Sequence, residues 1–383
     1  MSTNKHTSHQ RGTRAQKIFL FTPLYPPHVG GSATFSSQLV SELGTRPRST
    51  EFVVLTSYHP DSELVERGTN SRVFRLLPRF QSLPSCIRIL LETVFGLAAT
   101  ALLLLLHDVD IAHIHPVSYA TPMVAVLAKL AGIPLIYDCR GAGFPQWLIA
   151  YIPPDSVFST SPVIDDIMSN CGIDKSDIYR TPIINPEYVG EYSNNRIVSQ
   201  NLDNFRLLYV GKLRKEKGIE LVLDSFEQLA PIYTELELHL IGDGPLRSKV
   251  ESRATHSRFR DRIIYHERLS HRETLEQISS ADLLLHPSAR ETGPRTVLEA
   301  CEIGTPVVAT SVGIVPELFT HTELGTIIER SVDSIVDSVE QFIKKWNGPE
   351  PYCTGEPGDF SRATWKEIAD TVEEAYESTM APQ

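Results

Sequence analysis

The sequence predicts an α/β fold made of two Rossmann-like halves. Short apolar runs that resemble strands alternate with helix-like segments along most of the chain, which is the pattern of parallel α/β architecture. The alternation is interrupted over residues 185–204, where Asn, Glu, Tyr and Ser replace periodic apolar residues, as is typical of a linker. With 383 residues, the chain is long enough for two domains of ordinary size.

The first half is expected to start with a strand at residues 17–22, a Pro/Gly loop and a helix over about 32–43. Further strands are expected at 51–56, 71–76, 109–114, 134–137 and 156–159. Residues 1–16 are polar and basic without the apolar core of a secretory signal, so they are predicted to be a disordered tail. The first domain is therefore placed at 17–190 and the linker at 191–204.

The second half repeats the pattern. Strands are expected at 205–210, 236–241 and 262–265, with a helix over 219–229. Ser270 followed three residues later by Glu273 predicts a capping box at the start of another helix. After a Gly/Pro stretch at 355–358, a last helix is expected over about 364–379. These features place the second domain at 205–358 and a C-terminal helical segment at 359–383.

Composition limits the function classes. The formal net charge of −11 argues against general nucleic-acid binding, which requires a basic face. The five cysteines are scattered, odd in number and without metal-like spacing, so they are predicted to be free thiols in a reducing, cytoplasmic compartment.

Residues 89–106 carry one charge, Glu92, and end in five consecutive leucines, which reaches the lower limit of a membrane-spanning length. Polar and small residues interrupt this segment, which favours a helix buried between a sheet and a lipid-facing surface over one that spans the membrane. The leucines at 102–106 are predicted to be core. A peripheral contact with the cytoplasmic face of a membrane is left open, because such a helix can lie on a bilayer.

Two carboxylates lie eight positions apart in residues 287–300, at Glu291 and Glu299. Between them, Gly293 and Pro294 mark a helix start, with the proline tolerated in the first turn. The amides that follow would be unpaired donors at the positive end of a helix, which is an anion site. One acid could then meet each end of a nucleotide-linked ligand. A capped surface helix with two solvated acids is an equally compatible interpretation.

Several glycine-containing loops each follow a predicted strand. In parallel α/β sheets, ligands lie outside the carboxyl ends of the strands, so these loops are expected to share one rim. They are Gly30-Gly31, Gly211-Lys212, residues 242–244, residues 291–293 and Val312-Gly313. The run 211–218 also concentrates four cations, which suits the oxygens of a diphosphate, although charge runs are often only solvated loops.

Taken together, these motifs resemble those of the retaining glycosyltransferases of family 4. The resemblance spans most of the chain and is most specific from Gly211 to Glu317. It is carried by Gly211-Lys-Leu-x-x-x-Lys-Gly218, Gly242-Asp-Gly-Pro-Leu246, Pro287-Ser-x-x-Glu-x-Gly293, Glu299-Ala300, Gly304-Thr-Pro-Val-Val-Ala-Thr310 and the loop ending at Gly31. The family implies a GT-B fold, in which two Rossmann-like domains face each other across a cleft and the last helix crosses back to the N-terminal domain.

The resemblance also implies roles for individual residues. Lys212 and Lys217 would stabilise the departing nucleoside diphosphate, and Glu291 would contact the donor sugar near the reacting centre. The remaining implied donor-binding residues are Gly31, Gly242, Asp243, Gly244, Gly293, Arg295, Thr296 and Glu299, the last of them at the ribose hydroxyls.

The chain departs from the family pattern at three places. Lys212 stands where the family usually has Arg, which keeps the charge but loses the bidentate fork. Residues 138–141 replace a segment where a histidine is common, which makes Arg140 a candidate sugar or phosphate contact. Residues 181–186 replace the usual Pro-Asn-Gly turn. His115, at a strand end, is a candidate acceptor-side contact, with a structural role equally compatible.

The expected function is retaining, hexosyltransferase-type transfer from a UDP- or GDP-sugar to an acceptor hydroxyl. Fixed cations and helix-end amides would support charge on the leaving diphosphate, so no metal and no cofactor are expected. The acceptor would be a glycan or lipid-linked precursor, as in polysaccharide biosynthesis, if the apolar helix touches a membrane.

Other functions stay open at this point. They are a catalytically inactive subunit that binds a nucleotide-sugar, a nucleotide-sugar epimerase on the same fold, and a glycogen- or sucrose-type transferase. An NAD-dependent oxidoreductase is disfavoured, because no Gly-x-Gly-x-x-Gly follows the first strand.

Overall fold

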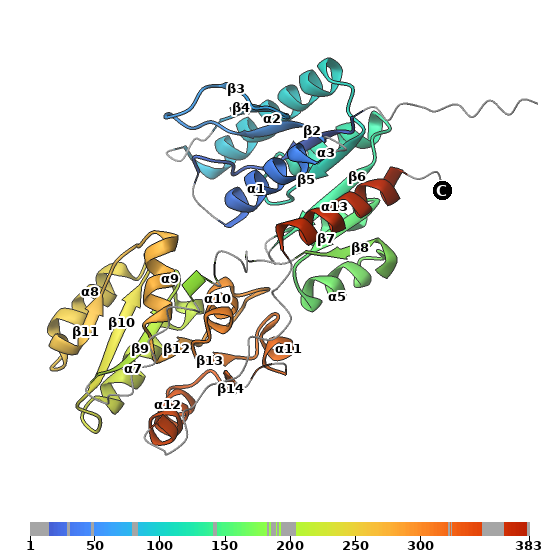
Figure 1. The fold of residues 1–383 in the computed structure, drawn as a ribbon. Helices are drawn as coiled ribbons and strands as arrows, with labels where there is room; N and C mark the ends of the chain where they lie inside the picture. Colours follow the sequence, from blue (N-terminus) through green and yellow to red (C-terminus); the bar gives the residue numbers. More distant parts are fainter. Residues whose placement is uncertain are drawn as a thin grey trace, which may run out of the picture.

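Two α/β units make up the computed structural model, drawn one above the other in Figure 1. The structure describes residues 15–28, 31–46, 50–78, 83–140, 144–181, 184, 189, 191–192, 204–320, 322, 324–346 and 364–380. The expected tail, apart from its last two residues, and most of the expected linker therefore lie outside the described residues.

The first unit is an eight-stranded sheet in the order β3-β4-β2-β1-β5-β6-β7-β8. All pairs are parallel except β3 with β4. Its strands are β1 Lys17–Phe21, β2 Glu51–Ser57, β3 Val65–Arg67, β4 Ser71–Leu77, β5 Ile111–Ile114, β6 Leu135–Cys139, β7 Ser156–Ser159 and β8 Ile178–Arg180. Its helices are α1 Gly31–Thr45, α2 Ser85–Leu106, α3 Thr121–Leu130, α4 Gln146–Tyr151 and α5 Pro162–Asn170, with a 3₁₀ turn at Lys175–Asp177.

The second unit is a six-stranded parallel sheet in the order β11-β10-β9-β12-β13-β14. Its strands are β9 Phe205–Val210, β10 Leu236–Ile241, β11 Ile263–Tyr265, β12 Leu283–His286, β13 Val307–Thr310 and β14 Gly325–Ile328. Its helices are α7 Ile219–Leu229, α8 Arg247–His256, α9 His271–Ser279, α10 Arg295–Ile303, α11 Val315–Phe319 and α12 Val332–Trp346, with 3₁₀ turns at Lys215–Lys217 and Arg260–Arg262.

Each sheet has helices on both faces. Side chains on the two faces of one sheet therefore pack into two separate apolar cores. In β1, Ile18 and Leu20 face one core, which includes α1 and α13, while Phe19 and Phe21 face the other, which includes α2 and α3. This follows from the period of two along a strand. Both sheets also reverse their strand order once, between β1 and β5 and between β9 and β12. Ligands bind at such switch points in open α/β sheets.

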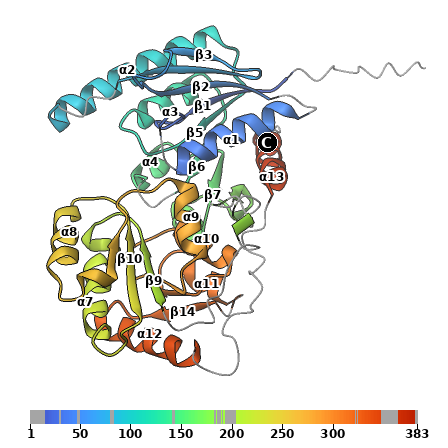
Figure 2. The ribbon, with the colours of Figure 1, turned by 60° about the vertical axis from the view of Figure 1, so that its left-hand side comes forward.

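The last helix, α13 (Trp365–Met380), leaves the second domain and packs on the first, as Figures 1 and 2 show. Ile368, Val372 and Tyr376 are buried in the same core as Ile18 and Leu39. A capping box begins the helix, because Thr364 and Glu367 exchange side-chain-to-amide hydrogen bonds of 3.2 and 2.7 Å.

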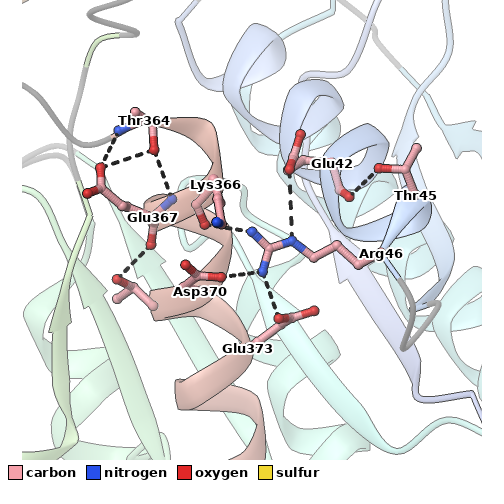
Figure 3. Close-up of polar contacts among 9 residues, drawn as sticks. Glu42, Thr45, Arg46, Thr364, Lys366, Glu367, Asp370 and Glu373 are labelled. Atoms are coloured by element: carbon pink, nitrogen blue, oxygen red, sulfur yellow. Dashed lines mark hydrogen bonds and ion pairs between the residues drawn. The ribbon is translucent and has the colours of Figure 1, made fainter.

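Arg46, just beyond α1, holds α13 in place (Figure 3). Its Nη1 is 2.6 Å from Asp370 and 2.7 Å from Glu373, and its Nη2 donates to the Lys366 carbonyl at 2.6 Å. The Arg46 side chain is only 12% exposed, so these bonds form in a partly dry environment. The C-terminal helix is thus joined to the first domain by apolar packing and by one multidentate cation.

The apolar helix α2 is less buried than expected. Gly96, Ala99, Thr100 and Leu103 face the sheet. Of the five leucines predicted to be core, Leu102, Leu105 and Leu106 are exposed, so that part of the prediction is wrong. Among the described residues, α2 is the one helix that is long and apolar enough to cross a bilayer. Buried core helices of soluble proteins and signal sequences can have the same length and composition.

Candidate functional site

The loops after β9, β10, β12 and β13 meet at one rim of the second sheet. Two glycines allow this approach. Gly218 has a φ of +77°, and a Cβ there would lie 2.3 Å from the Pro287 carbonyl. Gly242 has a φ of +143°, and a Cβ there would lie 1.9 Å from the Gly211 carbonyl. Only glycine fits either position, so the basic loop can lie directly against both neighbouring strand ends.

Lys217 and Glu291 form an ion pair at this rim. The Lys217 Nζ contacts Glu291 Oε1, and His286 Nε2 lies 3.2 Å from the same oxygen. The side chains of Lys217 and Glu291 are 23% and 16% exposed. The pair lies between the strand ends of β9 and β12, which is the switch point of the second sheet.

The ion pair sets the protonation of Glu291. Burial alone would raise the pKa of this carboxyl, but hydrogen bonds from His286 and Lys217 outweigh it and lower the pKa to about 2. Glu291 is therefore an anion at neutral pH, and it holds the Lys217 cation at the rim.

A cavity of about 550 Å³ opens at the same rim, lined by the segments that follow β9, β10 and β11. Lys212, Gly242, Asp243 and Gly244 line it together with Arg268, and Lys217 does not. Lys212 and Arg268 are exposed, and neither forms an ion pair with a described carboxylate. The cavity thus combines glycine-rich walls with the cations of Lys212 and Arg268 and one carboxylate, that of Asp243. Its other lining residues are Val210, Gly211, Arg214, Ile241, Pro245, Leu269 and Thr274.

Glu299, on α10, is 3% exposed and already engaged. Its Oε1 lies 2.7 Å from Arg295 Nε and 2.7 Å from His271 Nε2. Arg295 Nη2 is 2.9 Å from the same histidine nitrogen. The three side chains form a polar cluster between α9 and α10, with Arg295 and His271 partly exposed.

Helix α10 starts one residue later than predicted, because Pro294 is its N-cap with φ −68° and ψ 99°. Gly293 precedes it, and Arg295 and Thr296 supply the first two helical amides. The Pro294 carbonyl accepts from Val297 and Leu298, while no described acceptor receives the amides of Arg295 and Thr296. Those two donors stay available at the positive helix end.

The first-domain residues that were expected to contact the substrates, Gly31, Arg140 and His115, lie outside the rim of the second sheet. Gly31 begins α1. Arg140 is enclosed, with its Nε 2.9 Å from Asp138, its Nη2 2.9 Å from Thr181 and its guanidinium carbon 3.1 Å from the centre of the Phe35 ring. His115 is 4% exposed and its Nδ1 lies 3.8 Å from the Asp138 carboxylate.

This Asp138 cluster also reaches α13, because His113 Nε2 is 3.6 Å from Asp138 and His113 Nδ1 is 2.7 Å from the Tyr376 hydroxyl. Burial would raise the pKa of Asp138, but Arg140 and the two histidines lower it well below its usual value. The cluster joins the first sheet to α13. The sugar-contact role of Arg140 and the acceptor role of His115 stay predictions.

One Asp-x-Asp pair, of the kind that can hold a divalent ion, occurs at Asp108 and Asp110. It precedes β5, at the amino end of the strand and away from the rim. Asp110 Oδ2 accepts the Lys17 amide at 2.7 Å, so it stabilises the start of β1.

Residues 193–352 match the family described as glycosyl transferases group 1. The match covers nearly all of the second domain, so this domain is similar to the family. The match confirms the resemblance to family 4 glycosyltransferases, and it covers the loops of the rim described above.

Two relatives are similar to part of the chain. An uncharacterized glycosyltransferase of Methanocaldococcus jannaschii is 26% identical over 200 residues, 51% of each chain. One component of the human phosphatidylinositol N-acetylglucosaminyltransferase is 25% identical over 177 residues, 46% of this chain and 36% of that protein. The chain thus spans about half, or less, of the length of these relatives.

Among solved structures, Anabaena HepE in complex with UDP and glucose has a TM-score of 0.64 at 16% identity, covering 95% of this chain and all of HepE. At that identity the likeness shows the fold alone. It confirms the GT-B architecture that the resemblance implied, with α13 crossing back to the first domain.

Sequence reasoning missed His286, His271 and Arg268. His286 is the last residue of a buried apolar strand, and a histidine there resembles a core residue. His271 directly follows the predicted cap Ser270, at the start of a helix that packs on α10. Its position on the rim could have been suspected, because α9 begins shortly after β11 ends.

Proposed function

We propose that this group 1 glycosyltransferase moves a hexosyl unit from a UDP-sugar to a lipid-linked hydroxyl with retention of configuration. In the step, the bond from the anomeric carbon to the diphosphate oxygen breaks and its electrons stay on the diphosphate. The acceptor oxygen bonds to the same carbon, and the acceptor proton passes to the departing diphosphate.

The Lys217–Glu291–His286 contact carries this proposal. A departing diphosphate gains negative charge, and a preorganised cation at that point stabilises the transition state more than the ground state. Lys217 is held by its ion pair with Glu291. The turn that contains Lys217 is also held against the segment after β12, because the Ala289 amide donates to the Glu216 carbonyl at 2.7 Å. Glu291 remains an anion beside it, suited to accept hydrogen bonds from sugar hydroxyls.

The cavity and α10 supply the rest of a donor site. Lys212 and Arg268 place two further cations in a cavity large enough for a nucleotide. The Arg295 and Thr296 amides add an anion site, and the Glu299 cluster offers a buried carboxylate for ribose hydroxyls. HepE, which shares the fold, was solved in complex with UDP and glucose, and this supports a UDP-sugar as the donor.

A lipid-linked acceptor is supported by two observations. The human relative's name describes transfer of N-acetylglucosamine to phosphatidylinositol. In this chain, the exposed apolar face of α2 lies on the first domain, where a bilayer could contact it. Peripheral membrane contact and a role in surface-glycan synthesis belong to this proposal.

The decisive variant is Lys217→Ala. We expect kcat with UDP-glucose to fall by about 100-fold or more, because a fixed charge at the leaving group is lost. The matched control is Lys344→Ala, since Lys344 also forms an ion pair with a glutamate, Glu340, but in the last turn of α12, the end of that helix farther from the strand end of β14. Thermal unfolding would confirm that both variants fold. Near-normal turnover by Lys217→Ala would contradict the assignment.

Fixed cations also predict that transfer persists without divalent metal. We expect activity in excess EDTA to equal activity in Mg²⁺ or Mn²⁺, because Lys212, Lys217 and Arg268 would offset the diphosphate charge. Initial rates of product formation at matched ionic strength check this. A loss of activity in EDTA that Mn²⁺ restores would place a metal in the mechanism.

The two alternative functions, nucleotide-sugar epimerase and catalytically inactive subunit, would give different products from a transferase. Incubation with a labelled donor yields a labelled acceptor for transfer, an altered nucleotide-sugar for epimerisation, and unchanged donor for an inactive subunit. The anomeric configuration of the isolated product tests retention.

A further inference from the structure

The short turn that carries Lys217 is held in place by hydrogen bonds to its carbonyl groups. Lys217 is the last residue of the 3₁₀ turn Lys215–Lys217. The Glu216 carbonyl accepts the Ala289 amide at 2.7 Å, which ties the turn to the segment after β12. The neighbouring carbonyl, that of Lys215, accepts a hydrogen bond from a side chain much farther along the chain.

That side chain is Arg330, which lies between β14 and α12. Its Nη2 donates to the Lys215 carbonyl at 2.7 Å, and its Nε donates to the Pro287 carbonyl at 3.1 Å. Lys215 precedes Lys217 by two residues, and Pro287 precedes Glu291 by four. One guanidinium group therefore bonds to both of the backbone segments whose side chains form the ion pair at the rim.

The Pro287 carbonyl lies at a close contact between these two segments. A Cβ at Gly218 would lie only 2.3 Å from this oxygen, so the turn and the strand end approach each other directly. Glycine permits the approach but has no side chain that could hold it, whereas Arg330 bonds to the same carbonyl. The planar fork of an arginine can bond to two carbonyls at once in a fixed geometry.

The packing of α12 on α7 places Arg330 beside the turn. Arg330 comes just before α12, and Ile335 of this helix lies in the same apolar core as Ile219 and Val222 of α7. Helix α7 begins two residues after Lys217. The location of Arg330 thus follows from a buried contact between two helices, although its own side chain is exposed.

We propose that Arg330 is a positioning residue for the Lys217 cation. By bonding to the Lys215 and Pro287 carbonyls, it keeps the turn against the strand end that leads to Glu291. The Lys217 ammonium is then fixed before the diphosphate departs, as electrostatic stabilisation of a transition state requires. Arg330 does not line the donor cavity, so it acts through the turn and not on the donor. This inference rests on the role of Lys217 in the proposed function.

Steady-state kinetics of Arg330→Met in the full chain test this role. We expect kcat with UDP-glucose to fall about fivefold and KM to change little, because a loosely held cation stabilises the departing diphosphate less well. Arg330→Lys keeps the charge but not the fork, so its kcat should lie between those of the wild type and Arg330→Met. Wild-type kcat in Arg330→Met would overturn the proposal.

Arg262→Met is the matched control. Arg262 also donates to backbone carbonyls of the second domain, those of Ala230 at 2.6 Å and Tyr233 at 2.8 Å. It directly precedes β11, at the amino end of that strand and away from the rim. Its loss should lower the unfolding midpoint and leave kcat unchanged. An equal fall in kcat for the two variants would indicate a general effect of lost stability and would exclude a specific role of Arg330.

A double-mutant cycle separates an effect through Lys217 from an independent effect. If Arg330 acts through Lys217, then Arg330→Met should cause no further loss of kcat in a Lys217→Ala background. Losses that multiply in the double variant would show that the two residues act independently, which contradicts positioning.

Unfolding measurements test the same contact without any substrate. Glu291 stabilises the native state above its unfolded pKa, and this stabilisation is lost as the pH falls. The part of the pH dependence that Glu291 contributes is the difference from the matching Glu291→Gln protein. In Arg330→Met this difference should shrink by about half, because Lys217 would favour the carboxylate less while His286 still contacts it.

Urea unfolding across the acidic range measures this difference, and an unchanged value would overturn the inference. The same experiment separates the inference from the proposed function. Absence of transfer by the wild type, or normal turnover by Lys217→Ala, would contradict the proposed function. The unfolding difference would still decide whether Arg330 holds the Lys217–Glu291 pair.

Discussion

Burial and the hydrogen-bond partners of Glu291 shift the pKa of its carboxyl in opposite directions. Burial disfavours its charge, while Lys217 and His286 favour it strongly enough to bring its pKa to about 2. A carboxylate that stays ionised although burial disfavours its charge is typical of a functional site.

The lowered pKa makes stability depend on pH in a defined window. A carboxyl whose pKa falls on folding stabilises the native state above its unfolded pKa, near 4.5, and this stabilisation is lost as the pH falls toward 2. Relative to Glu291→Gln, the wild-type protein should lose about 2 kcal/mol between pH 7 and pH 3. Urea unfolding of both proteins across that range measures the difference, and parallel pH profiles would contradict it.

At the residue level, the sequence indicated some of the side chains at the rim, among them Lys217 and Glu291, but not His286 and not how these side chains pair. Lys217 and Glu291 are 74 positions apart, and only the contact between the strand ends of β9 and β12 brings them together. The engagement of Glu299 by Arg295 was accessible from the spacing of four along a helix, whereas the contact with His271 required the packing of α9 on α10.

Among the elements, the buried parallel strands were the most predictable. Those at 156–159, 205–210 and 236–241 begin and end where expected, because runs of apolar residues bounded by turns mark them clearly. The strands β3, β8 and β14 were missed, since each has only three or four residues and lies at a sheet edge. The exposure of α2 could not be predicted either, because an apolar helix gives the same pattern whether its partner is a sheet or a bilayer.

The attachment of α13 depends on Arg46. We expect Arg46→Met to destabilise the docked helix by about 1–3 kcal/mol, because Asp370 and Glu373 lose a shared, largely buried cation. Hydrogen exchange of the α13 amides should rise accordingly. Arg253→Met is the matched control, since Arg253 bridges Asp224 and Glu227 within the second domain and its loss should leave exchange in α13 unchanged. Unaltered α13 protection in Arg46→Met would contradict this role.

Over the whole molecule, an ion pair connects the two domains. Arg180, at the end of β8, contacts Asp165 in its own domain and lies 3.3 Å from Glu317 of α11 in the other. Its side chain is 42% exposed, so the pair should contribute less than about 1 kcal/mol to stability. Its location still suits a contact that biases how far the domains open.

Arg180→Ala should therefore change domain opening more than stability. We expect a larger radius of gyration at low salt, with the wild-type and variant values converging at high salt as the charges are screened. Small-angle scattering measures this, and the unfolding midpoint should shift little. Identical scattering of both proteins at low salt would show that this ion pair does not restrain the domains.

The return of α13 makes the N-terminal Rossmann unit discontinuous in sequence, with the other unit inserted into it. A gene fragment that ends before Trp365 would therefore leave Ile18, Phe35 and Leu39 without their cover and should yield insoluble material. Joining residues 364–380 through a short spacer to a fragment containing β1–β8 should restore solubility. Such a split-and-fuse design would allow each half to be produced and titrated with ligand separately.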